Sequence, residues 1–328
     1  ARHVFGFWPA IGTLVLLGFS PIIIMIQRMV VSENSIIFFM LLSLYLYLKK
    51  QPLLAVILAS VLASLVKPTG LAIVLIIGGD LLYTKQWRRF AIYTLSSVIL
   101  FLGIYTLYIW TINPSDTLSI LMSQSHRLIG WSNPAFIFSQ PGFQNRVVLD
   151  FSYFMLLIGG FWIFAQKQNG HERLLSMGTL ILMATIWATS AEQDMLGWYK
   201  IPLFILLGIN SARLLKDSNT VLFTVLLLIS VVNNLGLVRY PTHPLPESLV
   251  LRGLVGVTVL FMGWLLYHPQ YKKVIQTTAA IACIIFAVQS FYILHNYFGA
   301  RCRDRICPTP TVTQTSEVKR VIKSVFSN

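Results

Sequence analysis

Long apolar runs alternate along the chain with short stretches that are polar, basic or interrupted by proline. A helix needs roughly 20 apolar residues to cross the hydrocarbon of a bilayer, and most of the runs approach that length. They are continuous rather than alternating every second residue, so they predict helices and not the strands of a membrane barrel. We therefore predict an all-α fold, a polytopic transmembrane bundle of about eleven spans with a short loop region on the outer face. The predicted spans are 7–27, 34–48, 52–66, 69–83, 90–112, 150–166, 174–191, 201–215, 220–238, 248–267 and 274–297.

Two parts of this pattern are irregular. The runs 52–66 and 69–83 are short for full crossings, so they form either a re-entrant hairpin or two tilted spans in a thinned bilayer. The stretch 113–149 is too long for a minimal connector, and it either covers an active site or decorates the exterior, with a short amphipathic helix at 115–124. The predicted domains are a transmembrane unit at 1–297 and a polar, basic tail at 298–328.

The composition excludes an ordinary soluble domain. Hydrophobic residues make up 56% of the chain and charged residues only 11%, whereas soluble domains carry about 25% charged residues. The net charge of +14 would suggest nucleic acid in a soluble protein. Here the basic residues sit at the ends of apolar runs, where they set membrane orientation. We therefore expect membrane lipids, and no nucleic acid, as partners.

The positive-inside rule gives an orientation for the bundle. With the first residues in the cytoplasm, the inner side carries twelve Lys and Arg residues and the outer connections carry seven. The basic tail disagrees, because this topology places it outside. The inner residues are Arg2, Lys49, Lys50, Lys85, Arg88, Arg89, Lys167, Arg173, Arg213, Lys216, Lys272 and Lys273.

The first candidate cluster lies between the first two spans, on the predicted outer face, and contains Arg28, Ser32 and Glu33. In one interpretation Ser32 caps the second helix, and Glu33 is stabilised by its positive N-terminal end. In the other, Glu33 and Arg28 line an external cavity, where the carboxylate would orient an acceptor, assist a general base or bind a metal ion.

The second candidate cluster is Lys67-Pro68-Thr69-Gly70, where Pro and Gly interrupt the helix. A lysine between two apolar runs is costly unless it reaches water or an anion. Lys67 is therefore either a lysine that snorkels at a turn or a phosphate contact near the outer headgroups.

The third candidate cluster joins the spans 174–191 and 201–215 on the outer side. Its tryptophan and tyrosine are ordinary interfacial anchors when taken alone. Its acids and lysine converge on the same short segment, which favours a site where the lysine holds a lipid phosphate and the aromatic rings contact a sugar or isoprenoid. The cluster contains Glu192, Asp194, Trp198, Tyr199 and Lys200.

Other ionisable residues carry less information. Asp80 lies near the inner end of the span 69–83, where we expect it to pair with Lys85 or to meet water. Cys302 and Cys307 in the tail leave a local disulfide open. The sequence contains no zinc signature and no Gly-rich phosphate loop. The cofactor is unknown: a divalent metal ion is compatible with the sequence and not required by it.

The order of these clusters resembles the GT-C superfamily of integral membrane glycosyltransferases, in particular the bacterial branch related to protein O-mannosyltransferases and the aminoarabinose transferase of lipid A. In that family a span ends in a Ser-Arg-like segment and an acidic residue opens the next helix, and 27–34 is similar. The segment 64–71 is similar to the family's Thr-Lys-Pro-Thr-Gly turn. The segment 198–203 is similar to its aromatic-Tyr-X-X-Pro helix start. The resemblance covers roughly residues 1–215.

The resemblance implies that a sugar moves from a polyprenyl-phosphate carrier to a lipid, glycan or protein acceptor on the outer face of a bacterial inner membrane. Cations near the outer headgroups would hold the phosphate leaving group, a role that suits Lys67 and Lys200. Glu33 suits an acidic helper role. The family's main catalytic acid lies after its first span, and no such loop is visible here. Because the chain starts at Ala1 at the edge of a span, we expect that N-terminal spans and the main acid are missing.

Two other function classes remain open from the sequence. A secondary transporter or flippase for a lipid-linked sugar would have broken spans and charges near the midplane, whereas these charges gather at one face. A non-catalytic membrane scaffold would make Glu33, Lys67 and Lys200 individually dispensable. The transferase hypothesis requires these three residues to converge on one outward-facing cavity.

Overall fold

The computed structural model describes residues 1–20, 23–24, 32–112, 152–189, 200–216, 220–239 and 272–294, with isolated positions between 253 and 271. Within these ranges every regular element is a helix, and no strand occurs, which confirms the all-α prediction. The main helices are α1 (Arg2–Phe5), α2 (Phe7–Gly18), α4 (Ser32–Leu48), α5 (Leu53–Val66), η1 (Pro68–Leu71), α6 (Ala72–Tyr83), α7 (Trp87–Ile112), α10 (Ser152–Phe161), η2 (Trp162–Ala165), α11 (Gly170–Thr189), α12 (Ile201–Lys216), α13 (Thr220–Arg239) and α15 (Lys272–Leu294).

The helices follow the apolar runs closely, because the residues that interrupt the runs also end the helices. α5 begins after Pro52, and its last residue is followed by Lys67 in an extended conformation. Pro68 then opens η1, which continues into α6. The predicted helix at 115–124, the long stretch 113–149 and most of the run 248–267 lie outside the described residues.

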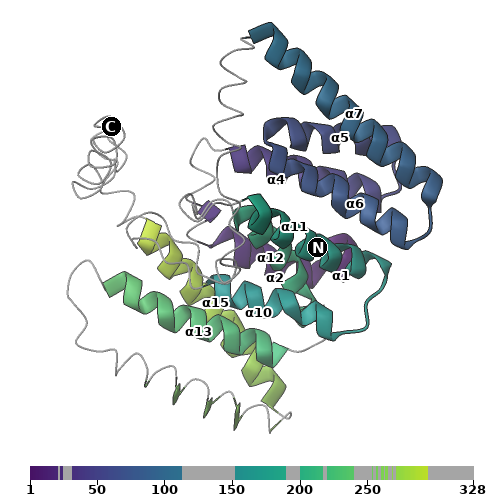
Figure 1. Cartoon of the computed structure of the whole chain (residues 1–328). Coiled ribbons are helices and arrows are strands. Elements are labelled where there is room, and N and C mark those ends of the chain that lie inside the picture. Colours follow the sequence, from purple (N-terminus) through teal and green to yellow (C-terminus); the bar gives the residue numbers. More distant parts are fainter. Residues whose placement is uncertain are drawn as a thin grey trace, which may run out of the picture.

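α12 is the central helix of the bundle. It packs against α2, α4, α10 and α11. Figure 1 shows α4, α5, α6 and α7 stacked on one side of it, and α13 beside α15 on the other. α11 joins the two parts by contacting both α6 and α12.

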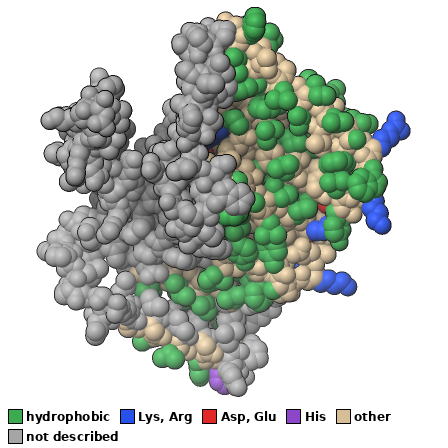
Figure 2. Space-filling view, viewed as in Figure 1, with side chains coloured by type: hydrophobic (Ala, Val, Ile, Leu, Met, Phe, Trp, Pro, Cys, Tyr) green, Lys and Arg blue, Asp and Glu red, His purple; other side chains and the backbone are tan. Residues whose placement is uncertain are grey.

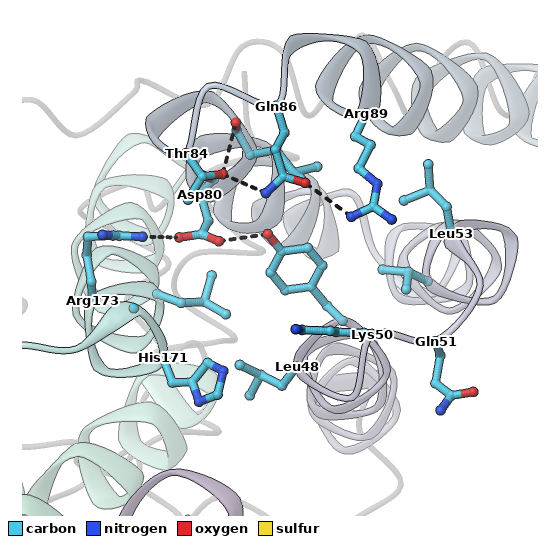
Figure 3. Close-up of a pocket in the computed structure, with 15 residues that line it drawn as sticks. Leu48, Lys50, Gln51, Leu53, Asp80, Thr84, Gln86, Arg89, His171 and Arg173 are labelled. Carbon is cyan, nitrogen blue, oxygen red and sulfur yellow. Dashed lines mark hydrogen bonds and ion pairs between the residues drawn. The ribbon is translucent and has the colours of Figure 1, made fainter.

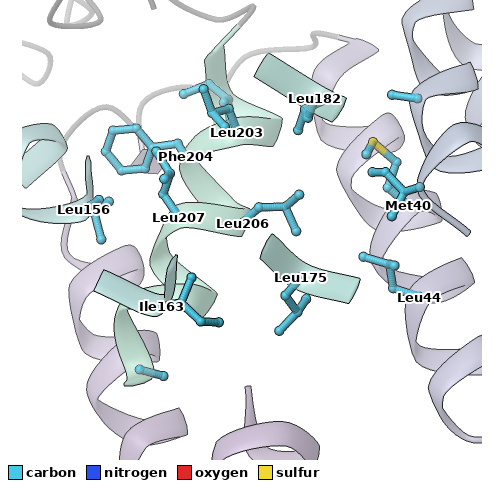
Figure 4. Packing of buried hydrophobic residues seen from close by; sticks show 14 of the residues in the cluster. Met40, Leu44, Leu156, Ile163, Leu175, Leu182, Leu203, Phe204, Leu206 and Leu207 are labelled. Carbon is cyan, nitrogen blue, oxygen red and sulfur yellow. The ribbon is translucent and has the colours of Figure 1, made fainter. Parts of the chain in front are cut away.

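The hydrophobic core runs through the bundle on both sides of α12. Leu203, Phe204 and Leu207 of α12 are completely buried, and Figure 4 shows these side chains between those of α4 and α10. A small residue allows the closest approach: a Cβ on Gly160 of α10 would lie 3.0 Å from the Cα of Leu207. Small residues at helix crossings have this role in membrane bundles as well.

Apolar side chains also cover much of the outer surface. Figure 2 shows them spread over one face, with Lys and Arg side chains gathered at its right-hand edge. In the described part of the chain, two helices are long and apolar enough to cross a membrane. They are Trp87–Thr111, with a mean hydropathy of 1.9, and Lys273–Tyr292, with a mean hydropathy of 1.8. Within each helix, an apolar stretch of 18 residues is mostly exposed, with only 17% and 28% of its residues buried, respectively. The other apolar helices are shorter, at 10–17 residues.

Candidate functional site

Glu33 and Lys67 form an ion pair at one end of the bundle. The Lys67 ammonium donates to Glu33 Oε1 at 2.7 Å, and the Ser32 hydroxyl donates to Oε2 at 3.2 Å. The Glu33 side chain is only 4% exposed, whereas that of Lys67 is 26% exposed. Glu33 also lies in the first turn of α4, where the helix dipole stabilises negative charge. The pair therefore holds a nearly buried carboxylate against a cation that reaches the surface.

The break in the chain after α5 positions Lys67. Lys67 adopts φ −162° and ψ 139°, so its side chain leaves the helical path before Pro68 starts η1. Gly70 then passes very close to α5: a Cβ there would lie 2.1 Å from the carbonyl oxygen of Ala63. Only glycine fits this position, which makes Gly70 part of the geometry that places the Lys67 ammonium.

Lys200 immediately precedes α12 and is almost completely buried, with 1% of its surface exposed. Its ammonium lies 5.6 Å from the centroid of the Tyr153 ring, and that ring stacks on Phe204. Burial lowers the pKa of Lys200 to about 7. A bound anion would favour the charged form of such an amine.

Lys200 and Glu33 lie at the same end of the bundle. Ile37 of α4 and Pro202 of α12 line one small cavity, and so do Met40 and Leu206 one turn further along each helix. At the opposite end, Tyr47 near the end of α4 reaches the start of α11 through Asp80 and Arg173, and Arg213 and Lys216 near the end of α12 contact Glu172 in the same turn of α11. α4 and α12 therefore run in the same direction and begin at the same end. The structure thus brings Glu33, Lys67 and Lys200 to one end of the bundle, from three separate segments.

The remaining predicted site residues lie outside the described residues. Arg28 belongs to the segment 25–31, and Glu192, Asp194, Trp198 and Tyr199 belong to the segment 190–199. Their predicted roles stay predictions.

Asp80 has a different partner from the one we expected. Its carboxylate accepts from the Tyr47 hydroxyl at 2.7 Å and from Arg173 at 3.2 Å, and not from Lys85. Lys85 follows the end of α6 with φ 58°, in the turn that leads into α7. The contact with Arg173 spans 93 residues of sequence, so no local pattern could have predicted it.

A second acid at this end, Glu172, was not among the predicted site residues. It is buried and accepts from both Arg213 and Lys216 of α12, the latter at 2.7 Å. Glu172 and Asn169 also exchange backbone-to-side-chain hydrogen bonds, at 3.1 and 2.9 Å. This is a capping box at the start of α11, and the spacing Asn-x-x-Glu was a signal that could have identified it.

The pKa of Glu172 reflects opposing effects. Burial raises the pKa of its carboxyl. The hydrogen bonds from Lys216 and the Asn169 backbone, together with the charges of Arg213 and Lys216, outweigh burial and hold the pKa below its ordinary value. Glu172 therefore stabilises the fold as a carboxylate.

No group of three His, Cys, Asp or Glu side chains that could hold a metal ion occurs among the described residues. Glu33 has a lysine and a serine as its partners rather than a second carboxylate.

Comparison of the chain with models of protein families, with curated proteins and with solved structures finds no match.

Proposed function

We propose that the chain is a multi-pass membrane glycosyltransferase that moves a sugar from a polyprenyl-phosphate carrier to an acceptor on the outer face of a bacterial inner membrane. The observation that carries this proposal is the Glu33–Lys67 ion pair at the same end of the bundle as Lys200. These are the residues to which the family resemblance gives a role.

The surface supports a membrane location. α7 exposes large apolar side chains along its length, including Leu95, Ile99 and Leu107, each more than half exposed. Exposed apolar area of this extent is uncommon on a soluble monomer. Three cations of the predicted inner side lie close together. Arg213 and Lys216 both pair with Glu172, and Arg173 is the next residue of α11. The positive-inside rule then places this end in the cytoplasm and Glu33 outside.

The two lysines and Glu33 would have different roles in the reaction. Lys67 and Lys200 would hold the lipid phosphate, whose negative charge grows as the bond to the sugar breaks. Glu33 would act as a positioning residue, because both of its carboxylate oxygens already accept hydrogen bonds, one of them from Lys67. The role of general base would fall to another group.

Transport is the less favoured alternative. A secondary transporter binds its substrate near the bilayer midplane. The Asp, Glu, Lys and Arg residues within α4, α5, α6 and α12 all lie toward the ends of these helices. This distribution suits chemistry at one membrane surface better than passage through the centre.

The test uses membranes that contain the full-length protein and a labelled pool of polyprenyl-phosphate sugars, and it follows release of the lipid phosphate. We expect release by the wild type and at least a tenfold loss in both Lys200→Ala and Glu33→Gln, whereas Lys85→Ala at the opposite end should retain activity. Absence of release from the wild type across several donor sugars would contradict the proposal, and a vesicle flux assay would then test transport.

A further inference from the structure

A cavity of about 370 Å³ lies at the end of the bundle opposite Glu33. It is formed where α4 and α6 end and where α5, α7 and α11 begin (Figure 3). Tyr47 lines it from the last turn of α4, about 20 Å along the helix from Glu33. The cavity is thus separate from the proposed transferase site, and its volume falls in the range of small-molecule sites.

Positive charge predominates in the cavity. Lys50, Arg89 and Arg173 line it, with Asp80 as the one carboxylate among its lining residues. Both oxygens of Asp80 are engaged, one by Tyr47 and the other by Arg173. Asp80 therefore balances one cation and leaves the charges of Lys50 and Arg89 uncompensated within the lining.

Arg173 is held in place with donor capacity left over. Its guanidinium lies 4.0 Å from the centroid of the Tyr83 ring and bonds Asp80 through one terminal nitrogen. Its Nε is buried and has no hydrogen-bond partner among the described residues. Arg173 also belongs to the first turn of α11, so the positive end of that helix dipole adds to the field in the cavity.

Lys50 enters the cavity from an unusual backbone position. It has φ 54° at the end of α4, and Gln51 N–H bonds the carbonyl of Leu46 while Lys50 N–H bonds that of Tyr47. This is a Schellman motif, in which glycine usually occupies the left-handed position. Figure 3 shows the Lys50 amine pointing toward the side of the cavity that His171 and Arg173 form.

The chain contains a matched copy of this motif. Lys85 has φ 58° at the end of α6, with the corresponding bonds from Lys85 to Leu82 and from Gln86 to Leu81. Lys85 does not line the cavity, although Gln86 does. The two lysines therefore share one backbone conformation and differ in their relation to the cavity.

We infer that this cavity binds a phosphate group. A phosphate presents several acceptor oxygens, so it can meet Lys50, Arg89 and Arg173 from three directions, and both arginine and lysine bind phosphate strongly. The phosphate belongs either to a phospholipid headgroup at this membrane surface or to a soluble phosphate compound. The inference does not rest on the proposed transferase activity, because none of the three cations has a role there.

The experiment uses the full chain, purified in an uncharged detergent and examined by native mass spectrometry. One arm adds dioleoyl phosphatidylglycerol, with dioleoylglycerol as the matched lipid that lacks phosphate. The other arm adds inorganic phosphate at constant ionic strength and measures displacement of the lipid and the shift of the unfolding midpoint. Each arm is repeated with Lys50→Gly and its control Lys85→Gly, and with Arg89→Gln and its exposed neighbour control Arg88→Gln.

We expect Lys50→Gly and Arg89→Gln each to weaken phosphate binding about tenfold, the effect of one charged hydrogen bond, and the two controls to stay within about twofold. Binding of the phospholipid that inorganic phosphate does not displace identifies a headgroup; binding or displacement by inorganic phosphate identifies a soluble ligand. The inference is overturned if neither probe binds, or if the controls weaken binding as much as the cavity variants. Arg89 is exposed, so its variant tests the cavity without the backbone change that Lys50→Gly introduces.

Discussion

The Lys67 ammonium lies 2.7 Å from Glu33 Oε1, although the two residues are 34 positions apart and lie in different helical segments. The carboxylate is nearly buried and the lysine is partly exposed. The pair is therefore asymmetric: loss of the lysine leaves a buried charge without its cation, whereas loss of the carboxylate leaves a lysine that can turn toward solvent.

This asymmetry predicts unequal effects of two substitutions. Lys67→Met should lower the free energy of unfolding by about 1–3 kcal/mol, less than for a fully buried pair because Lys67 is partly exposed. Glu33→Gln should cost less. Chemical unfolding in detergent measures both, with Lys85→Met as the control at the other end. Equal effects of the two substitutions would contradict the asymmetry.

Gly70 and Gly103 should respond oppositely to alanine. At Gly70 a Cβ would meet the Ala63 carbonyl oxygen at 2.1 Å, and at Gly103 in α7 it would meet nothing within 4 Å. Gly70→Ala should destabilise by about 1–3 kcal/mol through overpacking. Gly103→Ala should stabilise by about 0.5–1 kcal/mol through helix propensity. Thermal unfolding of the two variants beside the wild type checks both signs.

The carboxylate of Glu172 predicts loss of stability in acid. Its pKa is lowered in the folded protein, so the unfolded chain binds a proton first as the pH falls. The stabilisation should be complete above the ordinary carboxyl pKa and should disappear as the pH drops through the lowered value. The difference in unfolding free energy between wild type and Glu172→Gln, measured from neutral pH downward, should follow this course. A difference that does not change with pH would rule out the linkage.

The stability of the protein should also depend on pH through Lys200, which is a base rather than an acid. Its pKa is lowered to about 7 by burial, so between that value and its ordinary pKa the unfolded chain holds a proton that the folded protein has lost. Stability should therefore rise with pH over this window. Lys200→Met removes the titrating group, and the wild type should gain stability relative to it between neutral pH and about pH 10. A parallel pH dependence of the two proteins would contradict the lowered pKa.

Replacement by glycine of the two lysines with positive φ should increase the stability of the protein. Lys50 and Lys85 have φ of 54° and 58°, where a side chain on Cβ is unfavourable and glycine is not. Lys50→Gly and Lys85→Gly should each raise the free energy of unfolding by up to about 1 kcal/mol, because the relief of strain exceeds the added chain entropy of glycine. Thermal unfolding in detergent measures both. A clear loss of stability in either variant would show that the lysine side chain contributes packing that outweighs the strain.

The helices were predictable because they depend on local signals. The runs 34–48, 52–66 and 201–215 match α4, α5 and α12. Each run of apolar residues and the residues that end it are neighbours in the sequence, so both can be recognised without knowing the tertiary structure. The alternating runs also predicted that Glu33, Lys67 and Lys200 lie at the same end, and the contacts of α4, α5 and α12 place them there.

The contacts were less predictable, because they join segments that are distant in sequence. Glu33 and Lys67 were identified as separate candidates, and their pairing came only from the packing of α4 against α5. For Asp80 the nearest cation along the chain was the wrong partner, because Tyr47 and Arg173 of two other helices occupy both of its carboxylate oxygens. The charge of a residue can be read from the sequence, but its nearest opposite charge depends on the tertiary arrangement.

α4 carries Glu33 in its first turn and Tyr47 in its last, so one stiff rod touches both the ion pair and the cavity. A ligand at either end would affect binding at the other only if both ligands bias the same movement of α4. If they do, each would change the affinity of the other by the same factor, because linkage between two binding sites is reciprocal. α4 is therefore a continuous helix that connects the ion pair at one end of the bundle with the cavity at the other.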